Sequence, residues 1–173
     1  MVLLSLTEPL PDQNTQLEYH PYLLSHLEPV LKIHEENNII TSAYGPLTPL
    51  LRHPSGGPLK PVLTRIAGRI SKDHKDLPIE IDELAVLLLW QRAQGVLAVT
   101  ASGTPDNIKR LSAISYLPNG LLTKEEVEEI NSVGKKFHFR HYVSSHCNLT
   151  DDHALKATID RAYGARFHPP FST

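Results

Sequence analysis

Three short β-rich runs alternate with segments of helical periodicity along this chain, and this order constrains its fold more than any other feature. The β-rich runs are residues 15–19, 39–44 and 96–102. Strands that alternate with helices are typical of α/β proteins, in which crossover helices connect parallel strands. The sequence therefore predicts a parallel sheet, which needs cover on both of its faces.

The helices are predicted from the spacing of apolar residues and from capping patterns. A helix over residues 21–36 contains Pro29, which is expected to kink it or split it in two. Thr123 followed by Glu126 is the pattern of a capping box at a helix start. Residues 45–58 contain four prolines and are predicted to form a long loop. The other predicted helices are residues 61–71, 80–92 and 105–115, the last of them with Thr104 as its N-cap.

Composition and charge exclude several classes of protein. Of the 173 residues, 40% are hydrophobic and 21% are charged, which is typical of a folded globular chain. The net charge of −2 argues against an electrostatic nucleic-acid binder, and no apolar run approaches the roughly 20 residues that span a membrane. The N-terminus lacks the basic region of a secretory signal, and the single cysteine, Cys147, cannot form an internal disulfide. We therefore expect a cytoplasmic protein without nucleic-acid or membrane partners.

Four blocks of this sequence resemble a known enzyme family. They are similar to the C-terminal half of an aldo-keto reductase, and most similar to the fungal and yeast branch of that superfamily. The family fold is an eight-stranded (β/α) barrel, which typically needs about 250 residues. The resemblance therefore implies an α/β fold that is a partial barrel, made of the last three strand–helix units. The blocks occur in the family's order and at its intervals: QLEYHPYL (16–23), SAYGPL (42–47), LLLWQRAQGVLAVTASGTPDNIKR (87–110) and LTKEEVEEI (122–130).

The chain is predicted to have two parts. Residues 1–136 form the truncated half-barrel, and residues 137–173 form a tail that does not resemble the family and contains a helix over about 151–163. Four histidines and a cysteine gather in this tail, but their spacing matches no zinc template, so no metal site is expected. These residues are His138, His141, His146, Cys147 and His153.

The resemblance also implies which chemistry the chain lacks. Aldo-keto reductases transfer a hydride from a nicotinamide to a carbonyl, and a tyrosine donates the proton with help from an aspartate, a lysine and usually a histidine. All four residues come from the first half of the family's barrel, so none of them has a counterpart in this sequence. General acid catalysis contributes roughly 10²–10⁴ in rate. A lone copy of this chain is therefore not expected to reduce carbonyls in the family's usual way.

Part of the family's cofactor pocket has counterparts in this sequence. The resemblance implies that Tyr44 stacks on the nicotinamide ring, that Gln16 holds its carboxamide and that Ser102 lies near the adenosine phosphate. The family's basic anchors for the 2′-phosphate fall on Ala101 and Asn107, and asparagine cannot replace the charge of an arginine. No cofactor is therefore expected, with NADPH binding as the alternative.

Glu18, His20 and Tyr44 are the candidate catalytic residues. Gln16, Glu18 and His20 follow one another at intervals of two, so in a strand they point to the same side. A carboxylate beside an imidazole can orient it and adjust its pKa, and Tyr44 offers a stacking surface or a phenolic proton. The alternative is that Glu18 and His20 belong to the family's structural EYHP turn and that Tyr44 is a half-buried aromatic.

A retained pocket without its phosphate anchors favours non-redox acid/base chemistry on a small carbonyl-containing metabolite. The expected reaction is of the isomerase, dehydratase or cyclase type, as found in secondary metabolism. Two alternatives stay open: a non-catalytic pseudoenzyme or fragment, and one half of an NADPH-dependent oxidoreductase that a separate chain completes. Three strands cut from a barrel leave unpaired edges and an apolar face. We therefore also expect a homodimer with the tail at its interface.

Overall fold

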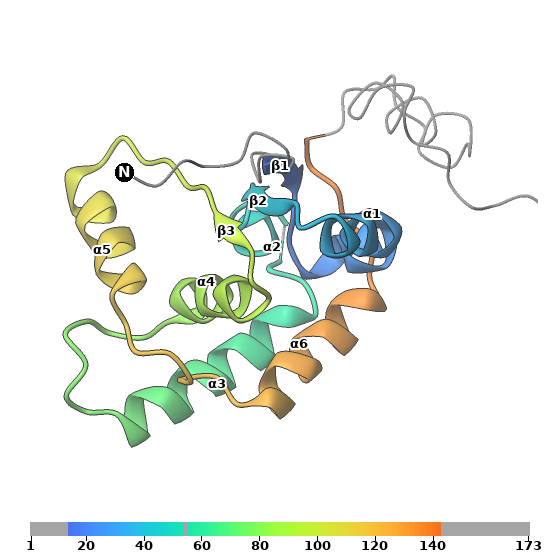
Figure 1. The fold of residues 1–173 in the computed structure, drawn as a ribbon. Coiled ribbons are helices and arrows are strands. Elements are labelled where there is room, and N and C mark those ends of the chain that lie inside the picture. Colours follow the sequence, from blue (N-terminus) through green and yellow to red (C-terminus); the bar gives the residue numbers. More distant parts are fainter. Residues whose placement is uncertain (1–13, 54, 143–173) are drawn as a thin grey trace, which may run out of the picture. The chain divides into compact units, whose positions relative to one another are not determined.

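The structure, a computed structural model, describes residues 14–53 and 55–142. Three parallel strands form its sheet, and helices connect them, which confirms the predicted α/β fold (Figure 1). The strands, in their order across the sheet, are β1 (Asn14–Glu18), β2 (Ile40–Tyr44) and β3 (Leu97–Ala98).

The carboxyl ends of β1 and β2 are level with each other, because Glu18 lies opposite Tyr44 in the register. β3 pairs with β2 over two residues only. One further hydrogen bond, from the Val99 N–H to the Ala43 carbonyl at 2.8 Å, continues the pairing. The strand predicted over 96–102 is therefore shorter than expected, since the chain leaves the sheet soon after Ala98.

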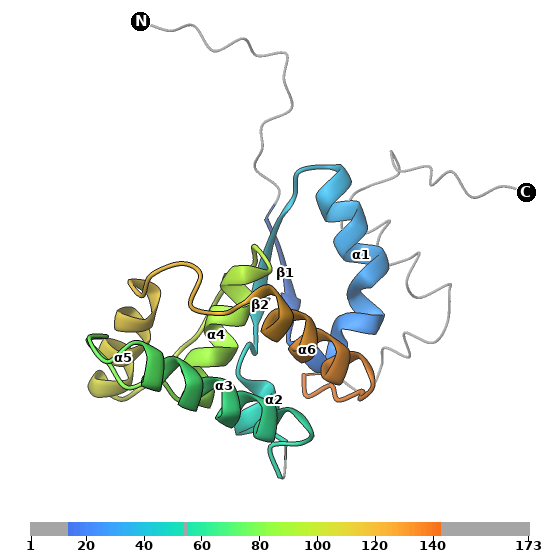
Figure 2. The same cartoon turned by 90° about the horizontal axis from the view of Figure 1, so that it is seen from below.

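Helices lie in two further layers beneath the sheet. α1 packs against β2 and α4 packs against β3, while α3 lies on the far side of α4 and alongside α6 (Figures 1 and 2). No helix in the described part of the chain is long and apolar enough to cross a membrane. The helices are η1 (Pro21–Leu23, a 3-10 helix), α1 (Leu24–Glu36), α2 (Thr48–Leu51), α3 (Leu59–Asp73), α4 (Glu83–Ala93), α5 (Pro105–Ser115) and α6 (Lys124–Lys135).

Capping side chains set the start of two helices. The predicted capping box of α6 is confirmed: the Glu126 N–H donates to Thr123 Oγ1 at 3.2 Å, and the Thr123 N–H donates to Glu126 Oε2 at 3.0 Å. α4 begins later than the predicted residue 80 because Asp82 is its N-cap. The carboxylate of Asp82 accepts a hydrogen bond from the Ala85 N–H at 3.0 Å.

Two proline-containing segments differ from the prediction. α1 runs without a break through Pro29, which lies on an exposed position of the helix. The loop predicted over 45–58 contains the short helix α2, which places Pro49 in its first turn. A first-turn amide has no partner within the helix, so a proline at this position loses no hydrogen bond.

Trp90 of α4 belongs to the buried core. Its side chain is fully buried, and its ring stacks on Tyr19 with the centroids 5.6 Å apart. The indole N–H donates a hydrogen bond to Asn131 Oδ1 at 2.9 Å. Asn131 belongs to α6. The Trp90 side chain of α4 therefore contacts both α6 and the residue that follows β1.

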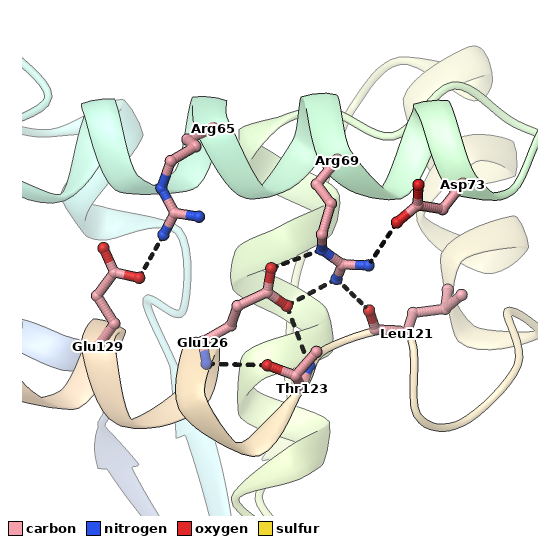
Figure 3. A network of polar contacts seen from close by, with 7 residues as sticks. All are labelled: Arg65, Arg69, Asp73, Leu121, Thr123, Glu126 and Glu129. Atoms are coloured by element: carbon pink, nitrogen blue, oxygen red, sulfur yellow. Dashed lines mark hydrogen bonds and ion pairs between the residues drawn. The ribbon is translucent and has the colours of Figure 1, made fainter.

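A polar network joins α3 to α6 on the side away from the sheet (Figure 3). Arg69 donates two hydrogen bonds to the Glu126 carboxylate, at 2.6 and 2.7 Å. The same carboxylate caps α6 through the Thr123 N–H. One turn away, Arg65 donates to Glu129. A two-point arginine–carboxylate contact fixes orientation as well as distance, so this network sets how the two helices lie.

His34 connects α1 to the central strand. Its Nδ1 lies 2.8 Å from the Thr41 hydroxyl oxygen, and both residues are buried. Burial lowers the pKa of His34 below its ordinary value, because desolvation disfavours the charged imidazolium.

We expect acidification to destabilise this packing. With a lowered pKa in the folded state, the unfolded chain binds a proton first, so stability is complete above pH 6.5 or so and falls as the pH drops below it. A single such histidine contributes at most about 1.4 kcal/mol per pH unit. Urea denaturation at several pH values should show a weaker dependence in His34→Gln than in the parent chain, with the exposed His74→Gln as control. An unchanged slope in His34→Gln would refute this assignment.

The face of the sheet opposite the helices carries exposed side chains. Thr41 points to α1, so the alternating Ile40 and Tyr44 lie on the other face. Ile40 is 53% exposed there and Leu97 is 57% exposed, and Gln16 is exposed on the neighbouring strand. Gln16 and Tyr44, two of the predicted site residues, lie on this face.

Candidate functional site

Gln16 and Tyr44 lie on adjacent strands and on the same face of the sheet. Gln16 pairs with Ser42 and Glu18 pairs with Tyr44, so Gln16 lies two register positions before Tyr44. Gln16 is exposed and Tyr44 is half-buried. A glutamine amide offers both a donor and an acceptor, and a tyrosine ring offers a flat apolar surface. The structure therefore brings together two of the three predicted ligand-binding residues.

Ser102, the third, lies in the loop between β3 and α5. Its hydroxyl oxygen accepts a hydrogen bond from the Thr104 N–H at 3.2 Å, which shapes the turn before the helix. Asn107 is exposed in the first turns of α5. Further along α5, Arg110 is paired with Asp82 at 2.5 Å. The start of α5 thus carries polar side chains, and the arginine of this helix is engaged elsewhere.

Glu18 and His20 form a buried pair at the end of β1. His20 Nε2 lies 3.3 Å from Glu18 Oε1, and the side chains of both residues are fully buried. The other ring nitrogen of His20, Nδ1, is buried and has no hydrogen-bond partner among the described residues. The His20 ring meets Tyr22 edge-on, with the centroids 6.2 Å apart.

Opposing influences act on the pKa of His20. Burial lowers it, and this is the largest effect. The hydrogen bond and the negative charge of Glu18 raise it, while the positive charge of Arg140 lowers it further. Burial prevails, so His20 is held in its neutral form more strongly than an exposed histidine.

The segment Phe137–His141, which we call the strap, passes over the Glu18 carboxylate. The His141 backbone N–H donates a hydrogen bond to Glu18 Oε1 at 2.9 Å. Arg140 Nε lies 3.8 Å from Glu18 Oε2, at ion-pair distance. The Glu18 carboxylate thus contacts both His20 and the strap.

Aromatic contacts attach the rest of the strap. Phe137 packs against Tyr22 and His53, with ring centroids 4.9 and 5.3 Å apart. Phe139 packs against the same His53 at 5.1 Å. His138 points to α1 and meets His26, with the centroids 4.1 Å apart. The strap thus presents alternate aromatic and imidazole rings to the body of the protein.

Sequence reasoning missed Arg140 and His141 as residues of the site. The only available signal was the alternation of large rings in FHFRH, residues 137–141, which is typical of an extended segment that packs on both sides. The predicted division of the chain at residue 137 stays untested as a domain boundary, although the strap contacts the part before it. The helix predicted over 151–163 lies outside the described residues.

No group of three or more histidine, cysteine, aspartate or glutamate side chains is placed to hold a metal ion within residues 14–53 and 55–142. His138 and His141 are described and belong to the strap. The other members of the predicted tail cluster, His146, Cys147 and His153, lie outside the described residues.

Comparison with known proteins shows what this chain is similar to. No family model matches it. It is 30% identical over 132 residues to the NADPH-dependent alpha-keto amide reductase of Saccharomyces cerevisiae, which covers 76% of this chain and 39% of that protein. It is 26% identical over 137 residues to the NAD/NADP-dependent indole-3-acetaldehyde reductase of Schizosaccharomyces pombe, which covers 79% of this chain and 44% of that protein.

Solved structures share the fold. A putative 2,5-diketo-D-gluconic acid reductase B matches with a TM-score of 0.52 and 23% identity, over 76% of this chain and 42% of that one. A thermostable aldo-keto reductase in complex with the inhibitor epalrestat matches with a TM-score of 0.50 and 19% identity, over 69% and 39%. The chain resembles part of an aldo-keto reductase. It spans about two fifths of the length of the two yeast reductases that it matches.

The prediction of non-redox chemistry is wrong in the light of these relatives. Both are named as NAD- or NADPH-dependent reductases, and nothing in the comparison supports an isomerase or a cyclase. The error arose because the lack of the family's catalytic residues and phosphate anchors in the matched blocks was taken to mean that the reaction itself had changed. The catalytic roles predicted for Glu18, His20 and Tyr44, and the predicted homodimer, stay predictions.

Proposed function

We propose that this chain forms part of an NAD(P)-dependent carbonyl reductase and contributes the strand ends that hold the nicotinamide end of the cofactor. The observation that carries the proposal is the similarity to two reductases, which extends over 79% and 76% of the chain. By their names, one relative acts on an aldehyde and the other on a keto amide. The proposed substrate class is therefore a small aldehyde or ketone.

The residues present fit the nicotinamide end of such a cofactor. The carboxamide of a nicotinamide needs both a donor and an acceptor, which the exposed amide of Gln16 can supply. Tyr44 lies on the same face, two register positions further on, and its half-buried ring provides a stacking surface. When bound, the nicotinamide supplies a hydride to the carbonyl carbon. In this proposal Gln16 and Tyr44 fix the plane of the ring and thereby the direction of transfer.

The alkoxide that hydride addition leaves needs a proton. In the family that this chain resembles, the proton donor is a tyrosine outside the four matching blocks. We therefore assign the proton transfer to the part of the enzyme that this chain does not cover. Glu18, whose buried carboxylate contacts His20, instead accepts a hydrogen bond from the strap.

The adenosine end of the proposed site discriminates weakly between the two cofactors. A 2′-phosphate is bound most strongly by a charged, two-point donor such as arginine. Asn107 is neutral, and the guanidinium of Arg110 is paired with Asp82. The site therefore lacks a strong preference for NADPH over NADH, and the proposal includes both.

The test is a calorimetric titration of the chain with NADH and with NADPH. Stacking of a heteroaromatic ring on an aromatic side chain contributes about 1–3 kcal/mol. Tyr44→Ala should therefore weaken the binding of both cofactors about 5- to 150-fold. Tyr116→Ala is the matched control, because Tyr116 is 85% exposed and lies on α5's far end. A parent chain that binds neither cofactor at millimolar concentration, or a Tyr44→Ala chain that binds like the parent, would overturn the proposal.

A further inference from the structure

Five of the seven histidines in the part of the chain that the structure describes gather at the strap. They come from segments that are far apart in the sequence, and the strap contacts or adjoins each of them. The centroids of the His26 and His138 rings are 4.1 Å apart, and both residues are exposed. The five are His20 after β1, His26 in α1, His53 after α2, and His138 and His141 in the strap itself.

We propose that the strap is a pH-responsive closure, which lies over the carboxyl end of β1 at neutral pH and lifts from it when His138 and His20 take up protons. The geometry that carries this inference is one carboxylate, Glu18, set against one arginine and several imidazoles. The inference concerns the strap alone and does not depend on cofactor binding.

At neutral pH the strap contacts a negatively charged group. The Glu18 carboxylate faces the Arg140 guanidinium at 3.8 Å and accepts the His141 N–H. Proton uptake by His138 would add a positive charge near Arg140, on a ring whose centroid lies 4.1 Å from that of His26. Like charges repel, most strongly where water is partly excluded.

The direction of the coupling follows from the groups that face His138. Burial lowers the pKa of His138, and so do the positive charges of His26, Arg140 and His20, whereas Glu18 raises it. The lowering influences prevail, so the closed strap binds a proton less readily than an open one. By linkage, acidification below the ordinary histidine pKa of about 6.5 shifts the strap toward the open state.

Buried His20 acts in the same direction. Its pKa is lowered by burial and by Arg140, with Glu18 opposing. Lifting the strap removes the cover from this pair and allows His20 to take up its own proton.

The strap has a fixed end and a releasable end. Lys135, the last residue of α6, is paired with Glu28 of α1 at 2.7 Å, and its carbonyl accepts a hydrogen bond from the Ser25 hydroxyl at 3.1 Å. These contacts involve no histidine, so acidification leaves them intact. Opening therefore involves residues after Lys135 and exposes the strand end beside Tyr44, the register partner of Glu18.

Hydrogen–deuterium exchange of the full chain tests the inference. The amides of the strap, including the His141 N–H that Glu18 accepts, should lose at least tenfold in protection between pH 7.5 and pH 5.5, after correction for intrinsic exchange rates. The amides of α6 should keep their protection over the same range. Unchanged protection of the strap, or an equal loss in α6, would overturn the proposal.

Matched variants separate this closure from a general loss of stability. His26→Gln combined with His138→Gln removes both rings of this contact, at two exposed positions. The amides of the strap should then stay protected from exchange at pH 5.5. His74→Gln, an exposed residue at the end of α3, should behave like the parent. Arg140→Gln removes the ion pair to Glu18 and should open the strap at both pH values. A double variant that loses protection as the parent does would refute the role of the histidine pair.

Discussion

Trp90→Ala is expected to lower the free energy of unfolding by about 3–5 kcal/mol. The side chain is fully buried, so its removal leaves a cavity between α4, the residues after β1 and α6. The stacking contact with Tyr19 is lost as well, and the Asn131 side chain loses the indole N–H as a donor. Since small domains are typically stable by about 5–15 kcal/mol, this one substitution removes a large share of the total.

Urea denaturation followed by circular dichroism measures this effect. Fluorescence is unsuitable because Trp90 is the only tryptophan of the chain. Tyr116→Ala, which removes an aromatic ring that is 85% exposed, is the control and should change stability by less than about 0.5 kcal/mol. A Trp90→Ala chain that unfolds at the same urea concentration as the control would contradict the central position of this residue.

Gly134→Ala is expected to destabilise the chain by about 1–3 kcal/mol or more. A Cβ atom at this position of α6 would lie 2.5 Å from both the side chain and the carbonyl oxygen of Pro21. One of these is a backbone atom of η1, so relief requires the helix and the η1 turn to move apart. This contact joins α6 to the segment that follows β1.

Gly68→Ala is a matched control that should have the opposite sign. Gly68 lies in α3, is exposed, and a Cβ there would meet no atom within 4 Å. Alanine is favoured over glycine inside a helix by roughly 0.5–1 kcal/mol. Thermal melting of the two variants should thus move in opposite directions from the parent. Equal shifts would show that α6 does not pack on Pro21 as described.

Local chemistry made much of the fold predictable from sequence. β1 and β2 lie within one residue of the predicted ranges, and α6 begins at the predicted capping box of Thr123 and Glu126. α2 was not predicted because a four-residue helix in a proline-rich segment leaves no periodic signal. β3 was predicted too long because β-propensity reports what the residues favour, while the pairing available on β2 decides where a strand ends.

The site was less predictable than the fold. Gln16 and Tyr44 share a face because alternation along a strand is a local property. The strap depends on contacts between residues that are far apart in the sequence. Glu18 accepts a hydrogen bond from the His141 N–H, 123 positions away, and periodicity carries no information over that distance. The function was predicted wrongly for a different reason. The chain spans 44% and 39% of its two relatives, so the residues that it lacks say little about the reaction.

The Glu126 carboxylate has a consequence for how this protein loosens. Both of its oxygens accept hydrogen bonds from the guanidinium of Arg69 in α3, and one of them, Oε2, also accepts the Thr123 N–H that completes the first turn of α6 (Figure 3). Fraying of that turn would therefore withdraw the acceptor from α3, and detachment of α3 would leave the cap without its counter-charge. The two helices are expected to open as one cooperative unit, instead of peeling away from the sheet one after the other.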